Sequence, residues 1–543
     1  MTTQQRSIDH PALRQPRMVP EQLMPETLRL RVALRFEAVD EQVYEPRGNE
    51  PMTIPAATRG TWVLTVTNEH SDIQEGGLIS FCVYNIQLAH RFQCTRPRCR
   101  DYATLSTDSD AQLALVPFGP VVAAHVLVES GTFAVGERFT LRLGDRSAGG
   151  PGSEAFWSAT DAEIRTVIDP TGDCQFRESI DNPQRIRITH RGELDLLRVL
   201  GPTVAGVDEP FDLHVIAFDQ CRNIVTDHTG RVRCDLPKAV RDLPSELRFD
   251  GSEHGVKIIK GVRFSQPGVH RLRMRTATGV EAISHPIVVQ RDPAMRMLWG
   301  DMHCHGWGDT TMYQMRLRTQ KMDPYHRHVQ ARDVGRFDWA APGPMSLPAG
   351  EADVVWQAWV EAHRKIDEPG RYIPFLSFEN HPPEGDRQVI FREGGEPCPG
   401  HCRHPVERMH AMYGQRDDAL LQVHIGGAAP DWSRYAPARE AMVEVASGFG
   451  NAEWLLQDAL QRGYRPGVAG ASDAHLGLLG APRAIEPMRG RFAFRAAPMN
   501  QRDTAFGAGP ITAVRAPACE RDAIWSGMKR GSTYATTGAR IYL

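Results

Sequence analysis

Imidazole and carboxylate side chains stand at the ends of short apolar runs in the C-terminal half of this chain. His303 and His305 end the run LWGDMHCH, and residues two apart on a strand point to the same side. Both imidazoles could therefore bind one metal ion, with Cys304 facing away. Similar residues end later strand-like runs, namely Glu379 in IPFLSFE, His424 after LLQV, and Asp473 and His475 in GVAGASDAH.

Nitrogen and carboxylate ligands without an obligatory thiolate are typical of catalytic ions rather than of thiolate-rich structural zinc. The carboxyl ends of strands gather at one edge of an α/β sheet or barrel, so we expect these residues to form one centre. One carboxylate can bridge two ions about 3.5–4 Å apart. The sequence predicts two divalent ions, Mn²⁺ or Zn²⁺, with Fe²⁺ or Co²⁺ as alternatives.

Three further residues are candidates for catalysis or for support of the ligands. His381 lies two residues after Glu379 and could supply a ligand or contact substrate, with a surface loop as the alternative. Asp309 could bind metal, accept a hydrogen bond from a ligating histidine, or lie in a surface loop. Glu444, in MVEVAS, could ligate directly or support another ligand.

A second cluster lies in the segment CPGHCRH. Its spacing differs from the usual pattern of zinc-binding Cys and His pairs, so we expect a solvent loop beside the site rather than a structural zinc. The residues concerned are Cys398, His401, Cys402 and His404.

The elements that must position these residues change in character along the chain. Residues 1–24 are polar and rich in proline, which predicts an N-terminal arm. Residues 25–175 contain short alternating runs that predict an all-β sandwich, and residues 176–292 repeat strands about every ten residues, as in an Ig-like sandwich. In residues 293–543 strand-like runs alternate with helical ones, which favours an α/β domain with parallel strands.

Composition excludes several classes of protein. The 543 residues carry 63 basic and 66 acidic side chains, and this balance gives no field for binding nucleic acid or a membrane surface. No apolar run approaches the roughly 18–20 residues of a membrane span, and no secretory signal is evident. Ten cysteines form no disulfide framework. We expect a cytoplasmic protein whose partner is a small-molecule substrate; its β surface is compatible with a homodimer.

The motifs WGDMHCH, VHIGG, VEVASGFG, GYRPGVAGASDAH and IWSGMKRGSTYATTGARIYL resemble those of the PHP-like metallohydrolases. They resemble more closely a bacterial family of that superfamily, long of unknown function, which includes carbaryl-type carbamate hydrolases. The resemblance covers residues 297–543 and extends through the preceding β-domain to about residue 185. It implies a distorted (β/α)₇ barrel. It also implies these roles: His303 and His305 as first-motif ligands, Glu379 as a bridging carboxylate, His424 from a middle strand, and Asp473 and His475 as the closing pair.

One position departs from the pattern of that family. Where the family has threonine, aspartate and histidine, this chain has Gly343, Pro344 and Met345. Neither proline nor methionine can replace a histidine ligand, so we expect two ions, or one, rather than three.

The function that follows is a divalent-metal-dependent hydrolase in which metal-bound hydroxide attacks the carbonyl of an ester, carbamate or amide. The preference for a carbonyl rests on the resemblance alone. Hydrolysis of phosphomonoesters or phosphodiesters is the alternative, since the same ions would stabilise that reaction. A second alternative is a degenerate, non-catalytic binding protein, because the third-motif histidine is missing.

Overall fold

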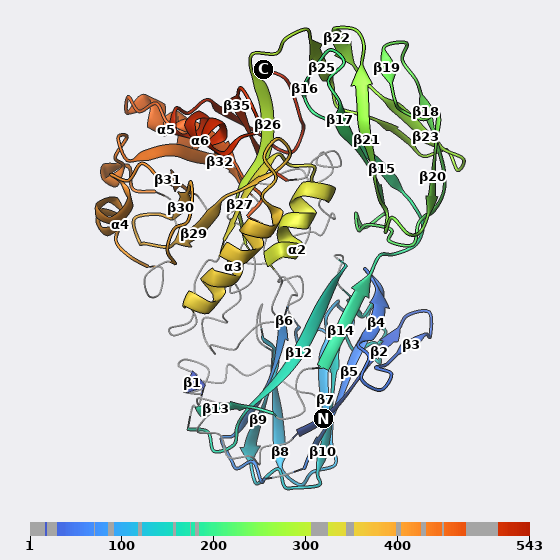
Figure 1. Cartoon of the computed structure of the whole chain (residues 1–543). Helices are drawn as coiled ribbons and strands as arrows, with labels where there is room; N and C mark the ends of the chain where they lie inside the picture. The colour runs from blue at the N-terminus through green and yellow to red at the C-terminus, as the bar shows by residue number, and fades with distance from the viewer. Residues whose placement is uncertain are drawn as a thin grey trace. The chain divides into compact units, whose positions relative to one another are not determined.

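The computed structural model describes residues 17–18, 30–69, 71–84, 92–117, 122–155, 159–173, 175–179, 184–305, 324–343, 352–397, 403–424, 430–447, 450–473 and 509–543. Most of its elements are strands (Figure 1). The described residues divide into two compact units, the first reaching Arg191 and the second beginning at Gly192. No helix in these ranges is long and apolar enough to cross a membrane.

The first unit consists of two sheets whose facing sides share an apolar core. Alternate residues of β2 are buried, and the rings of Phe81 and Phe139, from different sheets, lie 6.2 Å apart. One sheet contains β1 (Arg17–Met18), β4 (Met52–Pro55), β6 (Leu78–Tyr84), β8 (Gln112–Pro117), β9 (Val122–Ser130), β12 (Thr160–Asp169), β13 (Gln175–Glu178) and β14 (Gln184–Thr189). The other contains β2 (Leu30–Ala38), β3 (Val43–Tyr44), β5 (Arg59–Asn68), β7 (Ala103–Thr107), β10 (Arg138–Leu143) and β11 (Ser153–Glu154).

Strand β14 belongs to the first unit, although its spacing in the sequence groups it with the second sandwich. It pairs with β12 from Thr160 to Ile164, and β13 pairs with the same strand only at Val167 and Ile168. The long β12 therefore leaves an edge that β14 completes, and the first unit extends past residue 175. Of the expected N-terminal arm, only residues 17–18 are described, as β1 paired with β13.

The second unit begins with an all-β part that has its own apolar core. Three small sheets form it, in the orders β15-β17-β21-β19, β16-β25-β22 and β20-β18-β23-β24. The strands are β15 (Leu196–Leu200), β16 (Val204–Gly206), β17 (Phe211–Phe218), β18 (Thr229–Asp235), β19 (Val240–Arg241), β20 (Glu246–Asp250), β21 (Val256–Phe264), β22 (Gly268–His270), β23 (Arg273–Thr276), β24 (Glu281–Ile283) and β25 (Ile287–Gln290).

The rest of the second unit mixes strands and helices around two sheets. The first sheet comprises β28 (Ile373–Pro374), β27 (Trp339–Gly343), β26 (Arg296–His305), β35 (Ile511–Ala516) and β36 (Thr533–Thr536). The second comprises β29 (Leu376–Asn380), β30 (Arg387–Phe391), β31 (Ala419–Val423), β32 (Glu440–Ser447), β33 (Gly450–Asn451) and β34 (Gly467–Gly470). The helical segments are α2 (Pro324–Val329), η2 (Gln330–Val334), α3 (Ala352–Ile366), α4 (Val406–Tyr413), η3 (Trp432–Arg434), α5 (Glu453–Gln461) and α6 (Arg521–Lys529).

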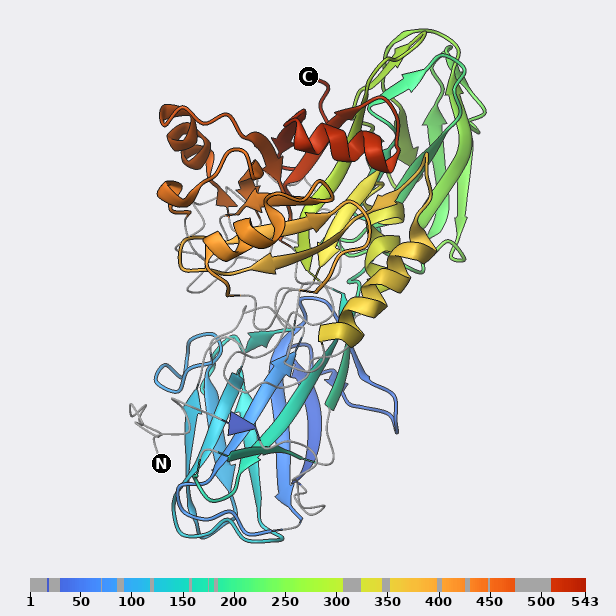
Figure 2. The same ribbon diagram turned by 60° about the vertical axis from the view of Figure 1, so that its left-hand side comes forward.

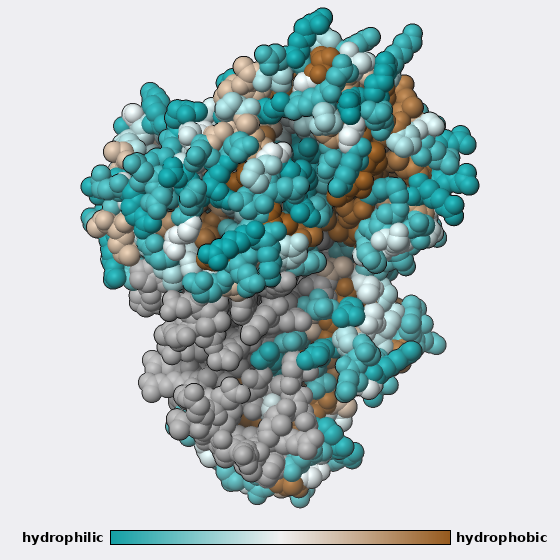
Figure 3. All heavy atoms as spheres, in the orientation of Figure 1, coloured by the Kyte–Doolittle hydropathy of each residue, from teal (hydrophilic) through white to brown (hydrophobic). Residues whose placement is uncertain are grey.

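Helices cover these sheets with their apolar faces. Helices α3 and α5 lie within residues 293–543, where the sequence predicts helical runs between strands, and they confirm that part of the prediction. Helices α2 and α3 pack side by side, as Figures 1 and 2 both show, while α6 packs on β35. On the face drawn in Figure 3, hydrophilic side chains cover most of the described surface, with smaller hydrophobic patches between them.

The strand directions differ from the expected parallel repetition. Strand β30 runs antiparallel to β29 and β31, and β35 runs antiparallel to β26. Only residues 381–386 connect β29 to β30, which is too short for a parallel crossover of about a dozen residues or more. The two sheets meet at their edges, where Phe375 N donates to Ala340 O (2.8 Å) and Asp473 N donates to His303 O (2.9 Å).

The all-β and mixed parts of the second unit pack directly against each other. The indole Nε1 of Trp299 donates to Thr203 Oγ1 (2.7 Å), and His214 Nδ1 lies 2.7 Å from Asp333 O. Leu200, Ile216, Phe218 and Val334 form one buried apolar cluster across this junction. Strand β26 therefore begins at the contact between the all-β and mixed parts, where Trp299 is hydrogen-bonded, and ends at the two candidate ligands His303 and His305.

Candidate metal centre

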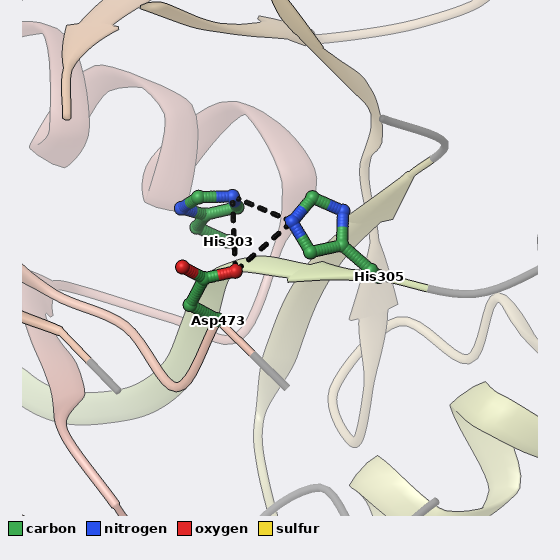
Figure 4. Close-up of side chains that lie close together, drawn as sticks. All are labelled: His303, His305 and Asp473. Carbon is green, nitrogen blue, oxygen red and sulfur yellow. Dashed lines mark hydrogen bonds and ion pairs between the residues drawn. The ribbon is translucent and has the colours of Figure 1, made fainter. Parts of the chain in front are cut away.

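The two histidines of β26 point to the same side of a strand that is buried from residue 297 onward. Alternation on this strand places Asp301, His303 and His305 together, whereas Cys304 packs into the apolar cluster on the other side. The Nε2 atoms of His303 and His305 are 3.0 Å apart (Figure 4). Both rings are almost fully buried, so their nitrogens face protein groups rather than bulk water.

Two carboxylates complete the set around these imidazoles. Asp473 Oδ1 lies 3.0 Å from His305 Nε2 and 3.7 Å from His303 Nε2 (Figure 4). Glu379 Oε2 lies 3.2 Å from His305 Nε2 and 3.5 Å from His303 Nε2. Asp473 lies three residues after the end of β34. Its φ of 47° turns the chain sharply there. The hydrogen bond from its backbone to His303 fixes that turn beside the histidines.

The spacing of these atoms fits a small divalent ion. Four donors at about 2.1 Å from a tetrahedral centre are about 3.4 Å from one another, and adjacent donors of an octahedron about 3.0 Å. The five measured separations run from 3.0 to 3.7 Å. Imidazole nitrogens and carboxylate oxygens are also the donor types that Zn²⁺ and Mn²⁺ accept. His303, His305 and Asp473 can therefore hold one ion, with Glu379 beside both histidines.

His424 extends the centre on the far side of Glu379. It follows β31, and its Nε2 lies 3.1 Å from Glu379 Oε1 and 3.8 Å from Asp473 Oδ2. The rings of His303 and His424 are 3.8 Å apart. Since Oε1 of Glu379 faces His424 while Oε2 faces β26, this carboxylate has the arrangement that a bridging ligand requires.

Glu444 supports His303 from behind. Its Oε2 lies 3.2 Å from His303 Nδ1 and accepts a hydrogen bond from Gln422 Nε2 (2.8 Å). A carboxylate at Nδ1 places the proton on that nitrogen and leaves Nε2 with a lone pair for a metal. Glu444 therefore fixes the orientation of His303, and its role in support of a metal ligand stays a prediction.

Asp301 joins the two segments that carry ligands. Its Oδ1 accepts hydrogen bonds from the backbone N–H of His303 (3.2 Å) and of Ser472 (3.1 Å). Burial raises the pKa of Asp301 to about 6. Asp301 is not among the residues predicted from the sequence, although its spacing of two from His303 and four from His305 is the same strand signal that identifies the histidines.

His381 lies between two carboxylates rather than in open solvent. Its Nε2 is 3.3 Å from Glu379 Oε2, and its Nδ1 is 3.3 Å from Asp386 Oδ1. The side chain of His381 is 17% exposed, more than that of any neighbouring ligand candidate in the described residues. Asp386 was not a candidate, because it lies in a loop before β30 and follows no strand.

The electrostatic field at the centre favours positive charge. Burial disfavours the imidazolium form of His303, but the negative charges of Asp473 and Glu379 outweigh burial and raise its pKa well above the usual value. Burial alone would raise the pKa of Glu379, yet the imidazoles of His303 and His381 hold it well below the usual value. Groups arranged to stabilise a proton here would equally stabilise a bound cation.

Several predicted residues lie outside the described residues. They are His475, Asp309, Pro344 and Met345, together with Cys398, His401 and Cys402. His404 is described, and its backbone exchanges two hydrogen bonds of 2.9 Å with the side chain of Asn380. Gly343 ends β27 opposite His305, where a Cβ atom would lie 2.0 Å from Ser377 O. The glycine is thus required for close packing of β27 against β29.

Comparisons with known proteins give distant matches. The family described as "Protein of unknown function (DUF3604)" matches residues 456–543, less than half of the chain. An uncharacterized protein of Chlamydia muridarum is 21% identical over 432 residues, and one of Chlamydia trachomatis serovar D is 20% identical over 435 residues. Each match covers 75% of this chain and 66% of the relative, so this chain spans just under two thirds of their length.

Among solved structures, one similar chain is a two-domain protein from Bacteroides vulgatus that contains a predicted PHP-like metal-dependent phosphoesterase. It is 16% identical, covers 46% of this chain and 67% of its own, and gives a TM-score of 0.30. A TM-score this low does not establish a shared fold.

Proposed function

We propose that this protein is a divalent-metal-dependent hydrolase that cleaves an ester, carbamate or amide bond of a small organic substrate. The observation that carries the proposal is the spacing of 3.0–3.7 Å among the imidazole and carboxylate atoms of four buried residues. These residues are His303, His305, Glu379 and Asp473. Close packing alone does not account for buried imidazoles and carboxylates at this spacing, because burying ionisable groups costs free energy unless they are paired.

Each residue of the centre has a distinct part in this proposal. His303, His305 and Asp473 would hold the first ion. Glu379, which lies 3.5 and 3.2 Å from the two histidines, would bridge that ion to a second one. Bound divalent ions would lower the pKa of water and polarise the scissile bond. Glu444 fixes the tautomer of His303, and Asp301 keeps β26 in register with the loop of Asp473. His381, as the partly exposed member, is placed to contact substrate.

The proposed architecture is a distorted PHP-like barrel. Its support is that the two sheets meet at both edges, through Phe375 and Ala340 on one side and through Asp473 and His303 on the other. The ligand candidates lie at the carboxyl ends of β26, β31 and β34 and near that of β29. This placement matches the edge at which α/β barrels gather catalytic residues.

The type of bond cleaved is testable with chromogenic substrates. We expect the Mn²⁺- or Zn²⁺-loaded protein to hydrolyse 4-nitrophenyl acetate and 1-naphthyl N-methylcarbamate faster, in kcat/KM, than 4-nitrophenyl phosphate or bis(4-nitrophenyl) phosphate. The variant His305→Ala serves as the control for contaminating hydrolases. A clear preference for either phosphate would replace the carbonyl assignment with phosphoester hydrolysis.

Metal content separates an enzyme from a binding protein. Protein purified without chelator should contain at least one divalent ion per chain by elemental analysis, and dialysis against a chelator should remove both the metal and the activity. Less than about one ion per chain, not restored by added Mn²⁺ or Zn²⁺, would favour a non-catalytic binding protein.

A further inference from the structure

The loop between β29 and β30 brings a second set of ligand-type residues to the centre. It carries His381 at its first position and Asp386 at its last, and both face Glu379. Ligand atoms of Glu379, His381 and Asp386 all lie within 4.8 Å of one another. We propose that these three residues form the second cation position of the centre, which rests on the proposed function. The ion would be a small divalent cation such as Mn²⁺ or Zn²⁺.

The possible ligand sets of the centre cannot all bind an ion at the same time. Two sets, His303 with His305 and Asp473, and His303 with Glu379 and His424, share one histidine. An imidazole nitrogen has one lone pair, and Nδ1 of His303 is occupied by Glu444, so these two sets cannot each bind an ion through His303. The set of Glu379, His381 and Asp386 shares no residue with the first set. It is therefore the set that can be filled at the same time as the first.

Hydrogen bonds hold the loop between β29 and β30 at both ends. At its start, the side chain of Asn380 exchanges two hydrogen bonds with the backbone of His404. At its end, Arg387 donates to the backbone carbonyls of Gly385 (2.9 Å) and Asp386 (3.2 Å) and forms a buried ion pair with Glu440. A metal site needs ligands whose positions are fixed before the ion binds, and this loop provides them.

The carbonyl of Asp386 connects the loop to the rest of the centre. It accepts a hydrogen bond from the backbone N–H of His424 (3.1 Å), so the loop cannot move without displacing a neighbouring candidate ligand. The loop is also pinned in its middle, where Glu384 O accepts from Asp431 N (2.8 Å). Asp386 keeps its position through contacts of its own backbone and not through surface packing alone.

The buried negative charges of the loop and of Glu379 also favour a cation at this position. Asp386 and Glu379 are 1% and 2% exposed, and buried carboxylates require compensating positive charge. Glu379 Oε2 and His381 Nε2 have no accessible surface and face each other at 3.3 Å, so both are buried ligand-type atoms. A shared divalent ion would satisfy both carboxylates and the imidazole. The competing arrangement is a protonated His381 that bridges the two carboxylates without metal.

The experiment counts the ions. The chelator-treated full-length protein is titrated with Mn²⁺ and with Zn²⁺, and bound metal is measured by equilibrium dialysis with elemental analysis. For the Mn²⁺ form, electron paramagnetic resonance detects the exchange coupling of two neighbouring ions. We expect two ions per chain and a coupled signal. Asp386→Asn and His381→Gln should each retain about one ion and give an uncoupled signal.

Asp431→Asn is the matched control, because it makes the same change on an exposed residue whose backbone contacts the same loop. It should retain both ions. His424→Gln is the comparison that decides between ligand sets, and far-ultraviolet circular dichroism of each variant excludes loss of folding. Two ions in both loop variants, or loss of the second ion only in His424→Gln, would overturn the inference while leaving the hydrolase proposal intact. Absence of bound metal in the unmutated protein would overturn both proposals.

Discussion

His303 is the residue on which the geometry of the centre depends most. One of its nitrogens faces Glu444 and the other faces His305, Glu379 and Asp473. A histidine held in this way has a fixed tautomer and ring orientation before any ion arrives. The support behind the ligand is therefore as much a part of the centre as the ligands.

The first prediction separates the two faces of β26. Replacing His305 or Asp473 by Ala removes one ligand, and we expect metal affinity to fall by more than the roughly 10–100-fold typical of lost supporting residues. Activity should fall with it. Cys304→Ala changes the neighbouring residue, whose side chain lies in the apolar cluster on the other face. Zinc titration by calorimetry should show little change for Cys304→Ala; equal losses in all three variants would contradict the assigned strand geometry.

A second prediction concerns His328, which is buried against Tyr372 and away from the centre. Its Nδ1 lies 2.8 Å from Tyr372 Oη, and burial, with the charge of Arg327, lowers the pKa of His328 to about 3. In the unfolded chain histidine has a pKa of about 6.5. Below that value the unfolded state takes up a proton that the folded state refuses, so stability present above about pH 6.5 is lost progressively toward about pH 3.

The expected slope for this one residue is about 1.4 kcal/mol per pH unit below pH 6. His328→Gln removes the titrating group and should flatten the dependence of the free energy of unfolding on pH by that amount. Urea denaturation of metal-free protein between pH 5 and 7 measures the slope. Both the unmutated protein and His328→Gln are measured without metal, so the contributions of the other histidines cancel in the difference between the two slopes. An unchanged slope would show that His328 does not have the lowered pKa.

Single residues also show how far the sequence predicts the centre. His303, His305, Glu379 and His424 stand at strand ends, and the structure brings them together because the carboxyl ends of neighbouring strands share an edge. Asp386 has no such signal. Its position depends on the hydrogen bond between its carbonyl and His424 and on Arg387, contacts that no periodicity in the sequence encodes.

At the scale of elements, the hairpin of β29 and β30 accounts for the main departure from the expected topology. The hydrophobic residues of β30 favour a strand but carry no information on its direction. The short connection of residues 381–386 does carry that information, since it permits only an antiparallel return. The same hairpin places His381 and Asp386 beside Glu379, which a long helical crossover would not have done.

The third prediction tests what holds this hairpin in place. Arg387 on β30 and Glu440 on β32 form a fully buried ion pair, and His410 Nε2 lies 3.4 Å from Glu440. Removing one partner of a buried pair leaves an uncompensated charge, so Glu440→Gln should cost about 3–5 kcal/mol in the free energy of unfolding. Chemical denaturation gives this value.

A matched control exists in the ion pair of Arg434 and Glu407. Both of its side chains are about half exposed, and exposed pairs contribute about 0–1 kcal/mol. Glu407→Gln should therefore leave the unfolding curve nearly unchanged. If Glu440→Gln and Glu407→Gln lowered the free energy of unfolding equally, burial of the ion pair would not explain the loss. The position of the loop would then depend on its backbone hydrogen bonds alone.

At the scale of the whole molecule, the second compact unit joins parts that composition separates. The sequence changes character near residue 293, and this change predicts a boundary between a sandwich and an α/β domain. The structure instead packs Val334 of the α/β part into one cluster with Leu200, Ile216 and Phe218 of the sandwich. Periodicity reports which face of an element is buried, but it does not identify the element that covers it.

The last prediction follows from that shared core. A fragment of residues 192–543 should fold and unfold in one cooperative transition, because its sandwich and α/β parts share buried side chains. A fragment of residues 293–543 would expose Val334 and leave Trp299 Nε1 without Thr203, so it should be markedly less stable or insoluble. Differential scanning calorimetry compares the two fragments with the full chain. Two separate transitions within residues 192–543, one of them matching the melting of residues 293–543, would show that the parts fold independently and that the junction contributes no stability.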